Sequence, residues 1–355
     1  MTADTIGGVW TYALDLARAL APQGVQVALA TMGRLPTPAQ SAEAASVPNL
    51  TLYPSEFALE WMADPWADVA RAGGWLLSLE AEWQPDIVHL NGYAHGVLPW
   101  NAPVLMVGHS CVLSWWQAVH GTNAPPEWQR YHAEVQAGLQ ATELIAAPTQ
   151  AMLGCLQAHY GPLAATCVLP NGRDAALFRP AKKQPVIFSA GRLWDDAKNI
   201  RALAEIAPTL PWPVRVAGET ASPGGQAQEF IGVHLLGCLP PSEIASRLAE
   251  AAIYALPARY EPFGLSALEA GLSGCALVLG DIPSLREVWG DAALYAAPDD
   301  PDALRGAILR LTSDAPLRRE MSARALDRTQ AYTLERMADG YLKAYQMLLG
   351  DSACA

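Results

Sequence analysis

The sequence predicts an α/β protein built from two doubly wound domains, and three observations lead to this prediction. The chain has 355 residues, more than one typical domain core, which suggests two domains of roughly 150 to 200 residues. Short apolar segments alternate with amphipathic segments, as they do in parallel sheets covered by helices. The alternation stops at the turn Pro170-Asn171-Gly172 and starts again with an apolar strand at Val186.

The individual elements follow from hydrophobic periodicity. In the first half we expect strands at 25–30, 50–53, 87–90, 104–107 and 144–147 and helices at 9–20, 127–139 and 150–159. In the second half we expect strands at 186–190, 214–217, 233–236, 253–256 and 276–279 and helices at 200–206, 241–250, 265–272 and 334–349.

The charged, proline-containing stretch 179–185 is the predicted domain boundary. It gives domains 1–178 and 179–332, followed by a terminal segment, 333–355, whose helix is expected to pack back on the first domain. A strand normally precedes the first helix of such a domain, yet only a few residues precede Gly7-Gly8. Either this strand is very short, or the true start lies upstream of Met1.

Composition and charge exclude some classes of partner. Hydrophobic residues make up 51% of the chain and charged residues 16%, which indicates a well-buried globular protein. The net charge of −12 argues against a nucleic-acid partner. Residues 1–170 contain no lysine and four arginines against thirteen acids, so strong electrostatic docking onto anionic lipid is not expected. Without a spanning segment or a signal peptide pattern, the expected compartment is the cytoplasm.

The six cysteines are scattered without metal-ligand spacing, so buried free thiols are expected. They are Cys111, Cys155, Cys167, Cys238, Cys275 and Cys354.

The strongest chemical signal is the segment from Glu261 to Glu269, in which seven residues separate two carboxylates at a loop-to-helix junction. Gly264 allows close approach of a ligand to the backbone, and the helix expected from Leu265 presents free N–H groups that favour phosphate. Acids beside a bound phosphate would repel it, so they are better suited to hold neutral hydroxyls attached to it. A phosphate flanked by hydroxyls describes a nucleotide sugar.

Two cations are expected beside this segment. Arg192 follows the strand that ends near Gly191, and Lys198 precedes the next helix. Ligands of open α/β sheets bind outside the carboxyl ends of the strands, so both side chains point to the same crevice. Arginine can bind a phosphate through two N–H groups, and lysine supplies a compact charge. Alone, each could be a solvated surface residue; together with the segment at Glu261 they indicate a diphosphate site.

With these motifs, the chain resembles a retaining nucleotide-sugar glycosyltransferase of family 4, among the group 1 glycosyltransferases. The resemblance runs nearly end to end, and the two specific motifs are Gly191-Arg192 with Lys198-Asn199 and Glu261 through Glu269. Weaker matches are Gly7-Gly8, Asp86-Ile87-Val88-His89, Gly108-His109-Ser110, Pro148-Thr149 and Pro170-Asn171-Gly172-Arg173-Asp174. The resemblance implies the GT-B fold, with two Rossmann-like domains facing a central cleft.

The resemblance also implies a role for particular residues. Arg192 and Lys198 would bind the donor diphosphate and stabilise the leaving group, and Glu261 would hold hydroxyls of the donor sugar. Glu269 would take the ribose hydroxyls. The remaining donor contacts would be backbone ones, at Phe263, Gly264 and Leu265 for sugar and phosphate, at Cys238 and Leu239 for the base, and at Gly7 and Gly8 for the diphosphate.

Two histidines follow predicted strands. The resemblance places His109 against the reacting sugar and the acceptor, and the alternative is a histidine satisfied inside the core. His89 also ends a strand, and for this residue the core alternative is favoured.

The implied reaction is transfer of a hexose with retention at the anomeric carbon, to a saccharide, lipid-linked or small-molecule acceptor. It requires no cofactor and no metal, since Arg192 and Lys198 already meet the diphosphate charge. Asp195-Asp196 and Asp299-Asp300 lack the usual Asp-x-Asp metal arrangement and are expected to be solvated acids.

Trp115, Trp116 and Trp128 concentrate aromatic area in the acceptor-side domain. They could stack on sugars or touch a lipid-linked acceptor, and core packing is the favoured alternative.

Two other functions remain open for the same fold. A nucleotide-sugar 2-epimerase would lack the two specific motifs in this form. A non-catalytic nucleotide-sugar-binding protein is conceivable because of the missing first strand, although every polar residue needed for transfer is present.

Overall fold

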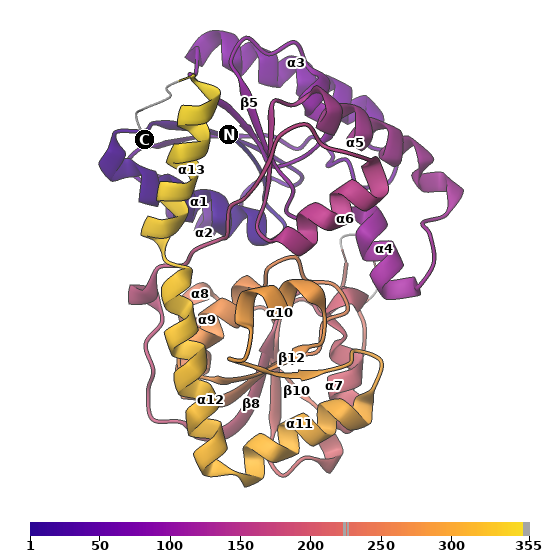
Figure 1. Cartoon of the computed structure of the whole chain (residues 1–355), viewed down its shortest axis with the longest axis vertical. Coiled ribbons are helices and arrows are strands. Elements are labelled where there is room, and N and C mark those ends of the chain that lie inside the picture. Colours follow the sequence, from indigo (N-terminus) through magenta and orange to yellow (C-terminus); the bar gives the residue numbers. More distant parts are fainter. Residues whose placement is uncertain (223–224, 226, 351–355) are drawn as a thin grey trace. The chain divides into compact units, whose positions relative to one another are not determined.

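The computed structural model describes residues 1–222, 225 and 227–350. The chain folds into two compact units (Figure 1). The first unit comprises Met1–Gln117, Thr122–Gly172 and Leu334–Ala355, and the second comprises Ala118–Gly121 and Arg173–Thr333. No helix in the described ranges is long and apolar enough to cross a membrane. Residues 351–355, and with them Cys354 and the end of the expected segment 333–355, lie outside the described residues.

The first unit contains two parallel sheets. One has the order β1-β2-β3, with β1 at Thr2–Asp4, β2 at Val27–Met32 and β3 at Leu50–Pro54. The other has the order β4-β5-β6-β7, with β4 at Val88–Leu90, β5 at Val104–Val107, β6 at Leu144–Ala147 and β7 at Thr166–Val168. The first strand is therefore present and only three residues long.

The strands β1 and β4 lie against each other, and the residue after β4 joins them. The backbone N–H of Asn91 donates to Thr2 Oγ1 at 2.9 Å, and its side-chain Nδ2 donates to the Thr2 carbonyl at 2.7 Å. A side-chain amide thus takes the place of a backbone ladder at this junction, and it holds the ends of β1 and β4 together.

The helices of the first unit are α1 (Gly8–Leu20), α2 (Pro38–Ala45), α3 (Trp66–Trp83), α4 (Val112–His120), α5 (Gln129–Ala141), α6 (Gln150–Tyr160) and α13 (Leu334–Leu348). The terminal helix α13 lies along α1 and against β5 (Figure 1). It buries Met337, Ala338, Tyr341 and Ala344 in the same core as Leu14 and Leu16 of α1. The described residues 334–350 are therefore part of the first unit.

The second unit is one six-stranded parallel sheet in the order β10-β9-β8-β11-β12-β13. Its strands are β8 (Gln184–Ala190), β9 (Val214–Ala217), β10 (His234–Leu235), β11 (Ala251–Leu256), β12 (Ala276–Gly280) and β13 (Leu294–Ala296). Its helices are α7 (Ile200–Ile206), α8 (Pro241–Glu250), α9 (Leu265–Leu272), α10 (Pro283–Trp289), α11 (Pro301–Ser313) and α12 (Ala315–Arg328).

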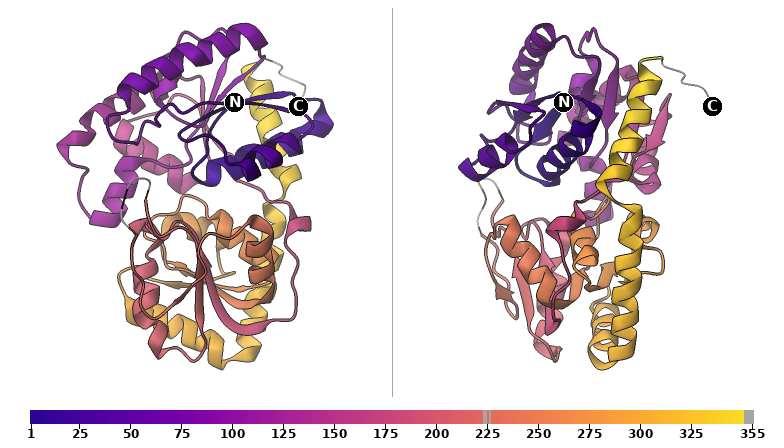
Figure 2. Two further views of the ribbon diagram at one scale, coloured as in Figure 1. Left: turned by 180° about the vertical axis from the view of Figure 1, so that it is seen from behind. Right: turned by 90° about the vertical axis from the view of Figure 1, so that its left-hand side faces the viewer.

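Both faces of this sheet are covered by helices (Figure 2). Phe188 and Tyr254 point into one apolar core, and their neighbours Ile187 and Ile253 point into the other. Strands buried on both faces are expected to be continuously apolar, as β11 and β12 are. The chain runs outward from β8 to β10 and then returns to β11 on the other side of β8. The switch point of the sheet therefore lies between the carboxyl ends of β8 and β11, where ligands bind in open α/β sheets.

The second unit begins at Arg173, whereas the sequence places a boundary between residues 178 and 179. Arg173 forms a parallel bridge with Thr333, and its N–H donates to the Tyr332 carbonyl at 3.1 Å. Phe178 is 5% exposed within the core of the second unit. The segment from 173 to 178 therefore packs with the second unit before the charged stretch begins.

Candidate functional site

The loops that follow β8 and β11 bring two of the predicted residues into contact. Lys198 Nζ lies 2.6 Å from Glu261 Oε2, and both side chains are largely buried. Lys198 ends a short 3-10 turn, Asp196–Lys198, that follows β8, while Glu261 lies between β11 and α9. The switch point of the sheet thus carries an ion pair between residues 63 positions apart in sequence.

Arg192 lies in the same loop and is held by an aspartate. Its Nη2 lies 2.9 Å from Asp195 Oδ2, and its guanidinium lies 5.4 Å from the centre of the Trp194 ring. The expectation that Asp195 is a solvated acid is wrong: the residue is 4% exposed, and its carboxylate also caps the 3-10 turn at Ala197 N–H. An aspartate at such a cap accepts backbone N–H groups that would otherwise lack partners.

The helix α9 begins at Leu265, as the sequence predicts. Gly264, the N-cap, has φ 93° and ψ 61°, a left-handed conformation that glycine adopts without steric cost. The first N–H groups of a helix have no partner inside the helix, so those that begin at Leu265 can donate to a ligand. The Phe263 side chain is 3% exposed and packs edge-on against Tyr332. A ligand could therefore meet only the backbone of Phe263.

Glu269 lies one turn into α9 and contacts an arginine whose role the sequence does not reveal. Its Oε1 lies 2.9 Å from Arg173 Nη2, with side-chain exposures of 15% and 8%. The guanidinium of Arg173 also lies 5.1 Å from the centre of the Phe178 ring. The sequence signal for Arg173 is its place directly after the Pro170-Asn171-Gly172 turn.

Cys238 and Leu239 follow β10 through Gly237, whose carbonyl accepts the N–H of Gly218 at 2.8 Å. The Cys238 side chain is exposed, and Leu239 packs partly against the core. The expectation of buried thiols holds for Cys111 and Cys275 and fails for Cys238, while Cys155 and Cys167 are half-buried.

In the first unit, His109 follows β5 and has a defined tautomer. Asn91 must place its amide nitrogen toward the Thr2 carbonyl, because a carbonyl only accepts hydrogen bonds. Its Oδ1 therefore faces His109 Nε2, 2.8 Å away, and His109 carries its proton on Nε2. Burial lowers the pKa of His109 to about 3, so the ring is neutral and Nδ1 keeps its lone pair. The residue is partly exposed, and Tyr12 packs edge-on against it, with ring centres 4.3 Å apart.

His89 has the structural role that the sequence favours for it. The residue is 3% exposed, stacks on Tyr341 and lies between two phenols, with Nε2 3.2 Å from Tyr12 Oη and Nδ1 2.7 Å from Tyr345 Oη. Burial lowers its pKa well below the ordinary value. His89 therefore joins α1, β4 and α13 inside the core of the first unit.

Gly7 and Gly8 form the start of α1 beside a carboxylate. Gly7 is the N-cap, with the extended φ of −141°, and Asp4 Oδ1 accepts the N–H groups of Ile6 and Gly7 at 3.1 and 3.0 Å. This backbone conformation does not itself require glycine. The role of the two glycines at a diphosphate therefore stays a prediction.

Trp115, Trp116 and Trp128 are all partly exposed, so none of them is a fully packed core residue. The Trp115 and Trp116 rings meet edge-on, with centres 6.1 Å apart, on α4.

Within the second unit the structure therefore joins Lys198 to Glu261 and pairs Arg192 and Glu269 with other residues, while His109, Gly7 and Gly8 belong to the first unit. Among residues 1–222, 225 and 227–350, no group of three or more His, Cys, Asp or Glu side chains could hold a metal ion.

Comparison with known proteins shows the family. Residues 6–177 match the family model Glycosyltransferase Family 4, and residues 174–328 match Glycosyl transferases group 1. The chain is 34% identical over 192 residues to the O-antigen chain mannosyltransferase B of Escherichia coli, across 48% of this chain and 50% of that protein. The match thus spans half the length of that relative. The chain is also 27% identical over 401 residues to the D-inositol 3-phosphate glycosyltransferase of Kineococcus radiotolerans, across 98% of this chain and 92% of the relative.

Solved structures share the fold. Sucrose-phosphate synthase from Thermosynechococcus elongatus has a TM-score of 0.80 at 19% identity, covering 96% of this chain and 94% of that one. Anabaena HepE in complex with UDP-glucose has a TM-score of 0.76 at 14% identity, covering 98% of this chain and 100% of that one. With both family models matched and the fold of these structures shared, the chain is a glycosyltransferase of family 4, among the group 1 glycosyltransferases, with the GT-B fold.

Proposed function

We propose that this glycosyltransferase transfers a hexose from a nucleotide-sugar donor to an acceptor hydroxyl, with retention of the anomeric configuration and without a metal ion. The observation that carries the proposal is the Lys198–Glu261 pair at the switch point of the second unit, beside the amino end of α9. Cations and free N–H groups suit a diphosphate, and a carboxylate suits hydroxyls. The fold shared with Anabaena HepE, which was solved in complex with UDP-glucose, supports this class of donor.

The ion pair is compatible with a bound donor. The ammonium group of Lys198 has three donors, so it can keep Glu261 as a partner while it donates to a phosphate oxygen. The carboxylate has about four lone-pair positions and can accept sugar hydroxyls on the side away from Lys198. Arg192, which is partly exposed, would add the second cation. The two charges would then stabilise the negative charge that develops on the departing phosphate.

The other donor contacts follow the residues that the sequence indicates. Glu269 would accept the ribose hydroxyls, and the base would meet the backbone at Cys238 and Leu239. The N–H groups of Phe263, Gly264 and Leu265 would help at the sugar and the phosphate. Gly7 and Gly8 would approach the diphosphate from the first unit.

In the proposed reaction, the bond between the anomeric carbon and the phosphate oxygen breaks, and the acceptor oxygen forms a bond to the same carbon from the same face. The departing phosphate oxygen takes the proton of the acceptor hydroxyl. Catalysis would rest on positioning and on stabilisation of the leaving group rather than on a covalent nucleophile. Retention is proposed from the family resemblance, and metal independence from the two cations at the diphosphate.

The acceptor would present a hydroxyl, and saccharide, lipid-linked and small-molecule acceptors are all compatible with this chemistry. The partly exposed Trp115 and Trp116 offer faces on which a sugar ring could stack.

The test is a panel of nucleotide sugars, with and without candidate acceptors, assayed for release of nucleoside diphosphate. Release that depends on an acceptor, with a product of unchanged anomeric configuration by NMR and full activity in EDTA, supports the proposal. Binding without release would indicate a non-catalytic nucleotide-sugar-binding protein. Conversion to an epimeric sugar would indicate a 2-epimerase, and loss of activity in EDTA would contradict metal independence.

A further inference from the structure

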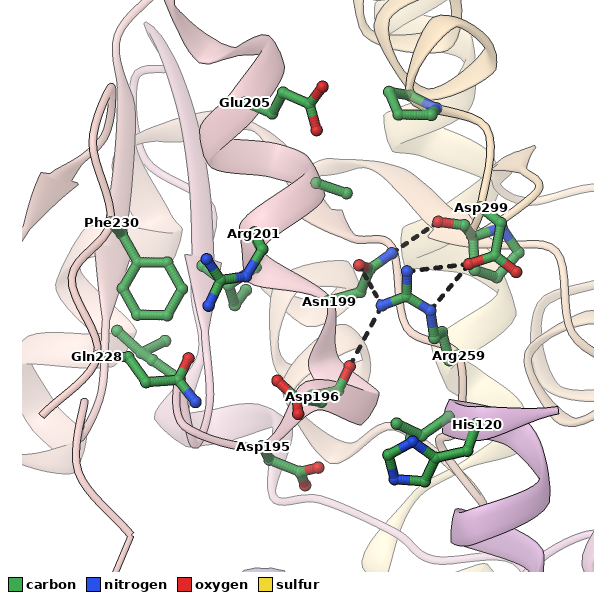
Figure 3. Close-up of a pocket in the computed structure, with 16 residues that line it drawn as sticks. His120, Asp195, Asp196, Asn199, Arg201, Glu205, Gln228, Phe230, Arg259 and Asp299 are labelled. Atoms are coloured by element: carbon green, nitrogen blue, oxygen red, sulfur yellow. Dashed lines mark hydrogen bonds and ion pairs between the residues drawn. The ribbon is translucent and has the colours of Figure 1, made fainter. Parts of the chain in front are cut away.

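Arg259 connects the two loops that carry Lys198 and Glu261. Its backbone N–H donates to the Ala197 carbonyl at 2.8 Å, and its Nη1 donates to Asn199 Oδ1 and, at 3.5 Å, to the Asp196 carbonyl. On its other side, Nε and Nη2 each lie 2.9 Å from Asp299 Oδ1. Figure 3 shows the guanidinium between Asn199, Asp196 and Asp299. One side chain thus reaches both the loop after β8 and the loop after β13.

Asn199 is the centre of this network. It is 3% exposed, and its φ of 56° and ψ of 36° place it in the left-handed region, which costs energy for a residue other than glycine. Its Nδ2 donates to the Pro257 carbonyl at 3.0 Å and to the Pro298 carbonyl at 2.7 Å, while its Oδ1 accepts from Arg259. The loops after β8, β11 and β13 are therefore tied together through one buried amide.

The loop after β11 is also held by a backbone contact with the end of β12. A Cβ on Gly280, at the end of β12, would lie 2.2 Å from the Ala258 carbonyl, so the two backbones are in direct contact. Arg259 follows Ala258 directly, and its backbone therefore has little freedom to move. Because its side chain is hydrogen-bonded to the loop after β8, it can hold that loop in place as well.

We propose that Arg259 is a positioning residue that sets Lys198 against Glu261 and so prepares the second unit for a nucleoside diphosphate. The proposal rests on the proposed function, because it assigns Lys198 to the diphosphate. Lys198 is adjacent to Asn199, and Glu261 follows Arg259 by two residues. A lysine side chain is long and flexible, so its charge is held in place only if the backbone that bears it is fixed.

The part of the network that matters is the contact with Asn199 rather than the ion pair with Asp299. The Asp299 side chain is 83% exposed, and exposed ion pairs contribute little in water. Removal of the Arg259 guanidinium would instead deprive the buried Asn199 Oδ1 of this hydrogen-bond donor. The loop after β8, in which Asn199 has a strained left-handed backbone, could then relax.

The test compares the binding of a nucleoside diphosphate with that of the matching nucleoside. The full-length protein is titrated calorimetrically with UDP, GDP and ADP, and the diphosphate that binds best is carried forward. Arg259→Ala should weaken diphosphate binding by about 10-fold or more, the equivalent of one lost hydrogen bond to a buried group, and leave nucleoside binding, measured by saturation-transfer NMR, unchanged. Asp299→Asn should change diphosphate binding by less than about 2-fold.

Arg305→Ala is the matched control, because Arg305 is an exposed arginine of the same unit that is paired with an aspartate, Asp302. It should bind the diphosphate as the wild type does. If Arg259→Ala does not fold, Arg259→Gln serves instead. Its amide nitrogen takes the place of the arginine Nε, so it can still donate to Asp299 but is too short to reach Asn199, and it should weaken diphosphate binding as Arg259→Ala would. The thermal midpoint without ligand is recorded for each variant.

Equal diphosphate affinity in the wild type and Arg259→Ala would overturn the positioning role, as would equal losses for diphosphate and nucleoside. If Arg259→Gln is the only folded variant, a diphosphate affinity equal to that of the wild type would overturn it. If the wild type binds none of the three diphosphates, the proposed function itself fails, and this outcome differs from the others because it needs no variant.

Discussion

The Nη2 atom of Arg173 lies 2.9 Å from Oε1 of Glu269, and this ion pair is largely shielded from water, with side-chain exposures of 8% and 15%. Arg173 is also the first residue of the second unit, bridged to Thr333, the last residue of that unit before α13. The acid that we assign to the ribose is therefore in direct contact with the segment that links the two units along the chain.

The two acids of the Glu261-to-Glu269 segment should respond differently to the same substitution. Glu261→Gln removes the charge beside the transferred sugar, so we expect kcat to fall by roughly 10²-fold. Glu269→Gln weakens the contact with the ribose, which is the same in the ground state and the transition state, so we expect KM for the donor to rise with kcat nearly unchanged. Steady-state kinetics with varied donor separate the two effects. The opposite pattern would mean that the donor binds in the reversed orientation.

Breaking the Arg173–Glu269 pair should also lower stability. Removal of one partner from a buried ion pair costs about 3–5 kcal/mol, because the other charge stays buried. Arg173→Met should therefore lower the free energy of unfolding in urea by an amount near the lower end of that range, since neither side chain is fully buried. The double variant Arg173→Met with Glu269→Leu should be less destabilised than the sum of the single variants. Strict additivity would show that the two charges do not interact.

Asn91 should control the protonation of His109. Asn91→Asp places a carboxylate beside Nε2 and should raise the pKa of His109 from its value of about 3. As the pH falls through this raised pKa, His109 gains a proton on Nδ1. The nitrogen could then no longer accept a hydrogen bond from a hydroxyl of the reacting sugar or the acceptor, against which the family resemblance places this residue. The pH profile of kcat/KM should therefore acquire an acidic limb that the wild type lacks between pH 5 and 9.

The other titratable groups that face His109 should not produce this limb. Burial raises the pKa of Tyr12 well above its ordinary value and lowers that of His89, so both remain neutral in this range. The matched variant Asn91→Ala removes the amide without adding a charge and should show no new limb. The same profile in all three proteins would mean that His109 does not take part in the reaction.

Buried histidines should make the folded protein sensitive to acid. Burial lowers the pKa of His89 well below 6.5 and also lowers that of His95, so between these values and about 6.5 the unfolded chain binds more protons than the folded one. The stability that these two histidines contribute is therefore fully present above about pH 6.5 and is lost as the pH falls, by up to about 1.4 kcal/mol per pH unit for each such group. Urea unfolding at pH 7.5 and 5.5 measures the loss, and His89→Gln should reduce it. An equal loss in this variant would assign the effect to other groups.

Much of the fold could be predicted because the buried strands are short, apolar and flanked by turns. The strands β5 and β6 and the helices α7, α8 and α9 have the bounds that hydrophobic periodicity indicates. The periodicity did not reveal α3, which contains Gly73-Gly74 in its centre, where glycine has a low helix propensity. A Cβ at Gly73 would lie 3.1 Å from Leu98 Cδ2, so the glycine leaves room for Leu98, and this tertiary contact is invisible in the local sequence.

The local geometry of the candidate site was predictable where it follows from residues next to each other. The start of α9 directly after Gly264 follows from one short segment. The pairing of Arg192 with Asp195, only three residues on, was missed, because Asp195 was expected to be a solvated acid. The partners of Asn199 could not be predicted, because Pro298 lies 99 residues away and meets it only when β13 takes its place at the edge of the sheet. For the same reason the sequence did not predict the contact of Arg173 with Glu269.

The central claim is that Arg192 and Lys198 stabilise the leaving diphosphate of a nucleotide sugar. The most direct test is the turnover number for acceptor-dependent release of nucleoside diphosphate by Lys198→Ala, with Arg192→Ala measured beside it and Arg305→Ala as the control. We predict a fall of roughly 10²-fold or more in both variants, because one oriented charge is worth about 2.7–4 kcal/mol in a transition state, and no change in the control. Turnover near that of the wild type in either variant would contradict the claim.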